Sequence, residues 1–234
     1  MRHHLKSSAC LTTFCLCSIL IVLAQDSHSL PPGFVYLDDL APGVVFDLRY
    51  AGHNNFIGQA IEGYEKSRCI LTEESTQALK LVQSDLNRVG LGLKIFDAYR
   101  PQRAVNSFVR WASDINDLRM KSQYYPDLDK ESLFPAGYIA GRSSHSRGST
   151  VDITIVSLHP SDNFAELDMG TPFDYFDPKS WISNVELSPN QRANRLLLRT
   201  IMERRGFQPY DKEWWHFTLI KEPFPDTYFD FPVE

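Results

Sequence analysis

Cysteine is scarce in this sequence of 234 residues: three of its four cysteines fall within the first 24 residues, and only Cys69 lies beyond them. The chain after residue 24 therefore excludes an intramolecular disulfide and a multi-cysteine zinc site. No nucleophile signature surrounds Cys69, which we expect to be a small buried residue. This part of the chain must fold on its hydrophobic core alone.

An excess of charge is also missing, as are low-complexity tracts and internal repeats. The formal net charge is -5 and no basic stripe with interleaved aromatic residues occurs, so nucleic acid is excluded as a partner. A hydrophobic content of 43% and an aromatic content of 12% argue against disorder and allow a full core. We expect one domain in residues 25–234, with its fold beginning near residue 33. The oligomeric state is not indicated.

No hydrophobic run is long enough to span a membrane. The longest, residues 10–24, has about 15 residues, whereas a membrane helix needs about 20. Basic residues precede this run, the small residues Val22 and Ala24 end it, and a polar break follows. The pattern predicts a signal peptide over residues 1–24, cleaved after Ala24, and export to the periplasm. Retention of the run as a membrane anchor is the alternative.

Capping signals and hydrophobic periodicity predict three helices and three strands. Thr72 can cap a first helix, Pro101 opens a second, and Ser188 begins a third as part of a capping box. The apolar stripe of the first helix extends to Val89. Patterns of apolar and β-branched residues predict strands over residues 91–100, 151–156 and 213–220.

Long irregular connections, residues 113–142 and 157–187, separate these elements, and the order of helices and strands is mixed. This order predicts an α+β fold, a single domain with a mainly antiparallel sheet flanked by helices. The connection 113–142 exceeds the usual loop length in a compact domain, which indicates a wall or lid of a substrate site.

A histidine and a carboxylate frame the entrance of the predicted strand at 151–156. His145 precedes Asp152 by seven positions, and Gly148 between them permits a sharp turn. Asp152 lies on the strand face opposite to its apolar neighbours. The pair is interpreted either as two metal ligands or as a loop histidine and a solvent-facing aspartate.

Glu213 and His216 form a second pair at the start of the last strand. Residues three apart face opposite sides of a regular strand, so these two share a cleft only if Glu213 lies in the turn before it. A hydrolytic zinc site needs three protein ligands and an open position for water, a set that His145, Asp152 and His216 would supply. Glu213 would then be the base that takes the proton of the water.

An arginine ends the predicted strand at 91–100. Arg100 is the candidate cation for the anionic tetrahedral intermediate of such a reaction, with Asp97 placed to orient it. The alternative is a solvated arginine at a helix entrance.

Longer motifs in the sequence resemble one family. They are "DAYRPQRAV" at 97–105, "SSHSRGSTVDIT" at 143–154 and "EWWHF" at 213–217. Together they resemble the D-alanyl-D-alanine dipeptidases of the VanX type, in the zinc D,D-peptidase group. The likeness continues through "HNNFIG", "QYYP", "MGTPFDYFD" and "YFDFPV", and so covers essentially the whole chain after residue 33. It implies an α+β core with zinc in a small, closed cleft beside an antiparallel sheet.

The resemblance also implies roles for individual residues. One Zn²⁺ per chain would be held by three ligands: His145, Asp152 and His216. Two catalytic residues would be the general base and acid and the cation that stabilises the tetrahedral intermediate: Glu213 and Arg100. Three residues would bind the substrate, the first of them through its free ammonium: Asp174, Ser143 and Tyr64. The implied reaction is hydrolysis of the small dipeptide D-Ala-D-Ala to D-alanine, in turnover or scavenging of peptidoglycan peptides.

The N-terminus departs from the family, whose cytoplasmic members begin near "FVYLDDL". An exported enzyme cannot reach the cytoplasmic dipeptide pool, so we expect a periplasmic scavenger in place of a glycopeptide-resistance enzyme. Two alternatives stay open. One is a D,D-carboxypeptidase or endopeptidase that acts on longer peptidoglycan peptides, and the other is a non-catalytic, zinc-stabilised wall-binding module.

Overall fold

One five-stranded sheet organises the computed structural model, which describes residues 30–234. Its strands, in spatial order, are β2 (Val45–Phe46), β4 (Leu91–Asp97), β5 (Thr150–Ser157), β7 (Glu213–Leu219) and β6 (Phe207–Tyr210). The pair β2 and β4 is parallel and the other three pairs are antiparallel, so the sheet is mainly antiparallel, as predicted. A small antiparallel sheet joins β1 (Phe34–Tyr36) to β3 (Ile70–Thr72).

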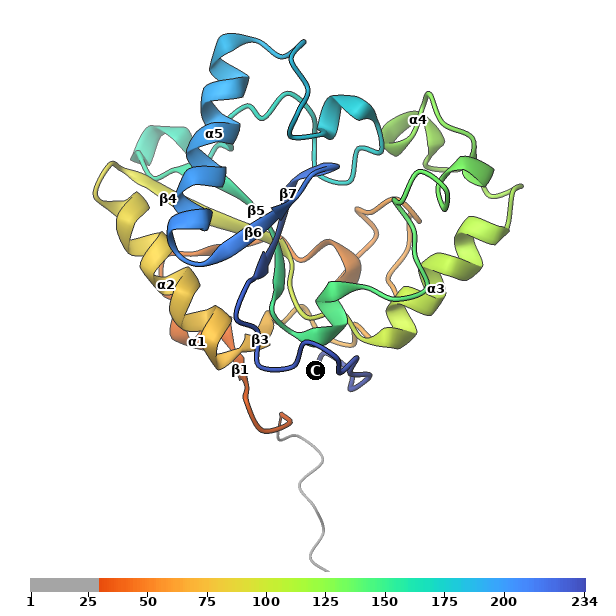
Figure 1. The fold of residues 1–234 in the computed structure, drawn as a ribbon, viewed down its shortest axis with the longest axis horizontal. Helices are drawn as coiled ribbons and strands as arrows, with labels where there is room; N and C mark the ends of the chain where they lie inside the picture. The colour runs from red at the N-terminus through yellow and green to blue at the C-terminus, as the bar shows by residue number, and fades with distance from the viewer. Residues whose placement is uncertain (1–29) are drawn as a thin grey trace, which may run out of the picture.

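Helices flank the main sheet on both sides (Figure 1). The α-helices are α1 (Leu37–Leu40), α2 (Glu73–Asn87), α3 (Gln102–Ser113), α4 (Lys121–Tyr124) and α5 (Pro189–Arg204). The 3₁₀ helices are η1 (Arg49–Ala51), η2 (Lys130–Ser132), η3 (Ser144–Arg147), η4 (Pro160–Asp162) and η5 (Pro178–Ser180). In Figure 1, α2 and α5 lie to one side of the sheet, and α3 and α4 lie across it on the other. The layers make a single α+β domain.

Two of the three helix starts are as predicted, whereas Pro101 is the N-cap of α3 and not a residue of its first turn. Thr72 accepts a hydrogen bond from the backbone N–H of Ser75 at the start of α2, and Ser188 forms a complete capping box with Gln191 at the start of α5. The predicted extension of the first apolar stripe to Val89 is wrong. The helix ends at Asn87, and Val89 lies in the following turn with 68% of its surface exposed.

Strand β5 is buried on both faces. Val151, Ile153 and Ile155 are fully buried on one face, and Asp152 and Thr154 are equally inaccessible on the other. The alternative of a solvent-facing aspartate is therefore wrong. A carboxylate in such a position needs a partner, because burial without one is costly.

Further expectations concern Cys69, membrane-spanning helices and the N-terminal segment. Cys69 is free and fully buried, as predicted. No helix within residues 30–234 is long and apolar enough to cross a bilayer. The signal peptide predicted for residues 1–24 lies outside the described residues.

Candidate active site

Strand register brings the central carboxylate beside a histidine and a second aspartate. Asp152 of β5 pairs with His216 of β7 on one side and with Asp97 of β4 on the other. Asp97 precedes Asp152 by 55 residues and His216 follows it by 64, yet antiparallel pairing makes the three residues neighbours. The sheet itself therefore builds the base of the site.

The second histidine enters from the short helix η3, which precedes β5. Gly148 ends this helix at a φ of +82°, and a Cβ there would lie 2.2 Å from the ring of Phe34. Only glycine fits this tight turn. His145 is buried, and its Nδ1 lies 2.7 Å from the carbonyl oxygen of Ala98. That contact requires Nδ1–H as the donor, which leaves Nε2 with a free lone pair.

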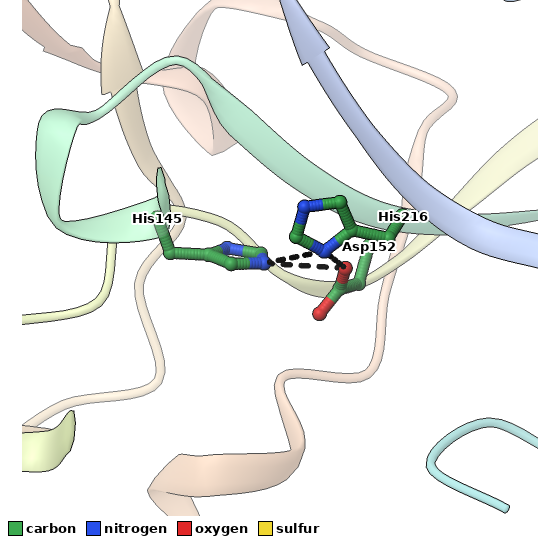
Figure 2. Close-up of side chains that lie close together, drawn as sticks. All are labelled: His145, Asp152 and His216. Atoms are coloured by element: carbon green, nitrogen blue, oxygen red, sulfur yellow. Dashed lines mark hydrogen bonds and ion pairs between the residues drawn. The ribbon is translucent and has the colours of Figure 1, made fainter. Parts of the chain in front are cut away.

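Three ligand atoms converge at the site, as Figure 2 shows. His145 Nε2 lies 3.2 Å from Asp152 Oδ1 and 3.3 Å from His216 Nδ1, and the last two atoms are 3.1 Å apart. In tetrahedral coordination with bonds of about 2.0–2.1 Å, ligand atoms lie about 3.3 Å from one another. The triangle therefore has the dimensions of three corners of a zinc coordination tetrahedron.

The hydrogen bonding of these residues also fits a cation. His216 Nε2 lies 3.2 Å from the hydroxyl of Ser144, which leaves Nδ1 toward the triangle. Asp152 Oδ1 is buried without a hydrogen-bond donor. Burial opposes ionisation of Asp152, but the imidazoles of His145 and His216 outweigh it and hold the pKa of the carboxyl well below its ordinary value. A carboxylate and two imidazole nitrogens that converge in this way could hold a metal ion.

Glu213 begins β7 beside this triangle. A register shift in β6 at Pro209 and Tyr210 interrupts regular pairing opposite Glu213, so Glu213 and His216 reach the same cavity. The expectation that Glu213 must lie in the preceding turn is therefore wrong, because it shares the cleft with His216 as the first residue of the strand. Glu213 Oε2 lies 3.5 Å from His216 Nδ1. Burial, followed by repulsion from Asp152, raises the pKa of Glu213 to about 8.

Arg100 follows the end of β4 by three residues, and its backbone N–H donates to the carbonyl oxygen of His145 at 3.3 Å. Its guanidinium donates from Nε to Asp97 Oδ2 at 2.9 Å and lies 3.5 Å from Asp152 Oδ2. Asp97 also accepts a hydrogen bond of 2.6 Å from the hydroxyl of Tyr64. The predicted orientation of Arg100 by Asp97 is present, with Tyr64 as a further support.

Asp174 closes the site on the side of the long connection 157–187. It is buried, and its backbone has a φ of +60°, which is strained for a residue other than glycine. The hydroxyl of Tyr50 donates to Asp174 Oδ2 at 2.9 Å. Burial, and then the charge of Asp152, raise the pKa of Asp174 well above its ordinary value.

These residues enclose a cavity of about 260 Å³. The lining includes seven of the eight site residues predicted from the sequence: Arg100, Ser143, His145, Asp152, Asp174, Glu213 and His216. Tyr64 does not line it and instead holds Asp97, so its contact with substrate stays a prediction. Residues 137–140 form part of the wall, which agrees with the role predicted for the connection 113–142.

Tyr50 is a site residue that the sequence pattern does not indicate. Tyr50 lines the cavity, holds Asp174 and lies with its ring 4.9 Å from the guanidinium carbon of Arg100. It belongs to the short helix η1, where a lone tyrosine has neither periodicity nor motif spacing to mark it. Only the three-dimensional packing places it at the site.

A three-ligand metal site beside a buried glutamate and an arginine is typical of metal-dependent hydrolases. Comparison with known proteins is in agreement. The family model of peptidase M15, described as D-Ala-D-Ala dipeptidase, matches residues 31–234, and the chain belongs to this family. The protein is thus a member of a peptidase family.

Individual relatives and a solved structure are also similar to this chain. A D-alanyl-D-alanine dipeptidase of Enterococcus faecium is 42% identical over 202 residues, which cover 86% of this chain and 98% of the relative. One of Enterococcus faecalis is 43% identical over 201 residues, with the same shares covered. Among solved structures, the LdcB LD-carboxypeptidase is similar with a TM-score of 0.45 at 16% identity, over 84% of this chain and 72% of that one.

Proposed function

We propose that this protein is a zinc-dependent dipeptidase that hydrolyses D-Ala-D-Ala to two molecules of D-alanine. The observation that carries the proposal is the triangle of ligand atoms, 3.1–3.3 Å on each side, in one cavity with Glu213 and Asp174. Membership of the D-Ala-D-Ala dipeptidase family and the two enterococcal relatives support the substrate.

The ligand set favours zinc. His145, Asp152 and His216 offer two imidazole nitrogens and one carboxylate oxygen, which is a common set for catalytic zinc. A zinc ion held there supplies Lewis acidity and lowers the pKa of a coordinated water. The second contacts of the histidines, to Ala98 and Ser144, orient the rings for this purpose.

Glu213 and Arg100 are proposed to act on the reacting groups. The carboxylate of Glu213 accepts a proton from the attacking water and later donates it to the leaving amine, while the peptide C–N bond breaks. The guanidinium of Arg100, held by Asp97, presents fixed positive charge for the tetrahedral oxyanion. A structural zinc site needs neither residue, which argues against the non-catalytic wall-binding module.

Asp174 favours a free dipeptide over longer peptides. Its buried carboxylate has no ion-pair partner among residues 30–234, and a substrate ammonium would supply one. An N-blocked or longer peptide offers no such cation and would leave the carboxylate unpaired in the cavity. This distinguishes the dipeptidase from the alternative of a carboxypeptidase or endopeptidase. Ser143, at the cavity wall, is proposed as a further substrate contact.

The test compares two substrates with the purified protein. We expect zinc-dependent release of D-alanine from D-Ala-D-Ala, loss of activity after chelation, and recovery when zinc is restored. N-acetyl-D-Ala-D-Ala should be cleaved much more slowly, because its amide cannot pair with Asp174. Faster cleavage of the acetylated substrate would contradict the dipeptidase and favour an enzyme for longer peptides.

We further propose that the protein is exported and scavenges dipeptides released from peptidoglycan. The support is the pattern of residues 1–24, with a short apolar run and small residues before Gln25. Expression of the full chain in a bacterial host should give a periplasmic protein whose N-terminal residue is Gln25. A cytoplasmic product that retains Met1 would contradict export.

A further inference from the structure

Arg195, on α5, is a buried arginine without a carboxylate partner. It is 7% exposed, and no acidic group lies within ion-pair distance of it in the part of the chain that the structure describes. Burial of an unpaired charge is expensive unless other groups satisfy it. The cost of burying Arg195 must therefore be offset by hydrogen bonds that an apolar side chain could not make.

The guanidinium of Arg195 donates hydrogen bonds to main-chain carbonyl oxygens. Nε donates to Met169 at 2.6 Å, Nη1 to Trp181 at 3.0 Å and Nη2 to Lys179 at 2.9 Å. Nη2 also lies 3.5 Å from the hydroxyl of Thr171. Met169 and Thr171 begin one loop, and Lys179 and Trp181 end it, so Arg195 joins the two ends of the segment 169–181.

Asp174 lies near the middle of this segment. Apart from the short helix η5, the segment has no helix or strand to fix its path. Its two ends are joined again by the hydroxyls of Thr171 and Ser180, 2.9 Å apart. Ser180 in turn donates to the carbonyl oxygen of Tyr175, the residue after Asp174, at 2.6 Å. A chain of hydrogen bonds thus leads from the closed ends of the loop to its tip.

The tip needs such support. Asp174 adopts a φ of +60°, a conformation that persists only where the surroundings determine it. Phe173 is stacked on Phe96 of β4, with ring centroids 4.6 Å apart, and Tyr50 holds the carboxylate. These contacts hold the tip against the sheet, and Arg195 holds the ends from which the tip is presented.

We propose that Arg195 is a positioning residue for recognition of the substrate ammonium. By closing the segment 169–181, it keeps the carboxylate of Asp174 at the place where the free amino group of the dipeptide binds. Arg195 does not line the cavity and so has no contact with substrate of its own. The inference rests on the proposed function, because it assigns to Arg195 a part in selecting free dipeptides.

The variants Arg195→Met and Arg195→Lys test this proposal against a matched control. Methionine keeps the length of the side chain and removes its donors, whereas lysine keeps the charge but cannot bridge both ends of the loop. Arg199→Met makes the same change one turn later on α5, where the arginine is 46% exposed and pairs with Glu203. Asp174→Asn gives the direction of effect expected when ammonium recognition is lost.

The measurement is kcat/KM for D-Ala-D-Ala and for N-acetyl-D-Ala-D-Ala. We expect Arg195→Met to raise KM for the free dipeptide by about 10- to 100-fold, the effect of misplacement by up to an ångström. Activity on the acetylated substrate should change little, so the preference for the free amine falls, as in Asp174→Asn. Arg195→Lys should give an intermediate loss, and Arg199→Met should retain the preference.

The outcomes separate the two proposals. If the unmodified protein does not hydrolyse D-Ala-D-Ala, the proposed function fails. If it does, and a folded Arg195 variant keeps the original preference for the free amine, the role of Arg195 is overturned. Equal losses on both substrates would also overturn it, because they indicate a general loss of structure. Should Arg195→Met fail to fold, Arg195→Lys alone decides the matter.

Discussion

Replacement of Glu213 by glutamine is expected to lower kcat for D-Ala-D-Ala by about 10²- to 10⁴-fold, the usual contribution of a general base. Glutamine has the size of glutamate but cannot accept and return the proton. Glu213 Oε2 is 3.5 Å from His216 Nδ1, yet Glu213 is not one of the three converging ligands. The variant should therefore bind zinc as the unmodified protein does.

The measurement pairs steady-state kinetics with the zinc content of the purified variant. Glu203→Gln is the matched control, because Glu203 is an exposed residue of α5 whose partner is Arg199. That variant should retain full activity. A Glu213→Gln enzyme with unchanged kcat would remove Glu213 from its assigned role, whereas a loss of zinc would instead show it to be needed for the metal.

Motif spacing could predict the residues of the site but not all of their neighbours. His145, Asp152 and His216 were recognisable because each lies at the start of a strand pattern or in a longer family motif. Their convergence depends on the pairing of Asp152 with His216, which strand alternation alone does not specify. Tyr50 had no signal at all, since its contact with Asp174 joins positions 124 residues apart.

The helices show a similar limit. Caps such as Thr72 and Ser188 act locally, so the starts of α2 and α5 could be predicted. The end of α2 could not, because Val89 continues the apolar periodicity although the chain has already turned toward Gly90. Periodicity reports which residues would share a face if the helix continued, and a turn that ends it earlier leaves the pattern unchanged.

Tyr64 is a motif residue whose observed side-chain contact is with Asp97, and its contact with substrate stays a prediction. Its hydroxyl donates to Asp97, and Asp97 accepts from Arg100, so Tyr64 helps to orient Arg100. Arg195 is the converse case. It lies in an ordinary amphipathic helix pattern, and only its buried contacts with the segment 169–181 connect it to the site.

Arg100→Met is the second variant for which we expect a large effect, on stability as well as on activity. Asp97 is 1% exposed and accepts hydrogen bonds from Arg100 and Tyr64. Removal of one partner of a buried pair leaves an uncompensated charge, which typically lowers the free energy of unfolding by about 3–5 kcal/mol. Loss of the cation that we propose to stabilise the oxyanion should lower kcat by about 10²- to 10³-fold.

A double variant separates these two effects. In Asp97→Asn/Arg100→Met the buried charge is gone, so chemical denaturation should show that much of the lost stability has returned. Activity should not return, because no cation remains beside the reacting carbonyl. Asp97→Asn alone retains Arg100 and should lose less activity than either variant without it. If the double variant regained both stability and kcat, Arg100 would be a structural partner of Asp97, and the oxyanion would have to be stabilised by the metal site alone.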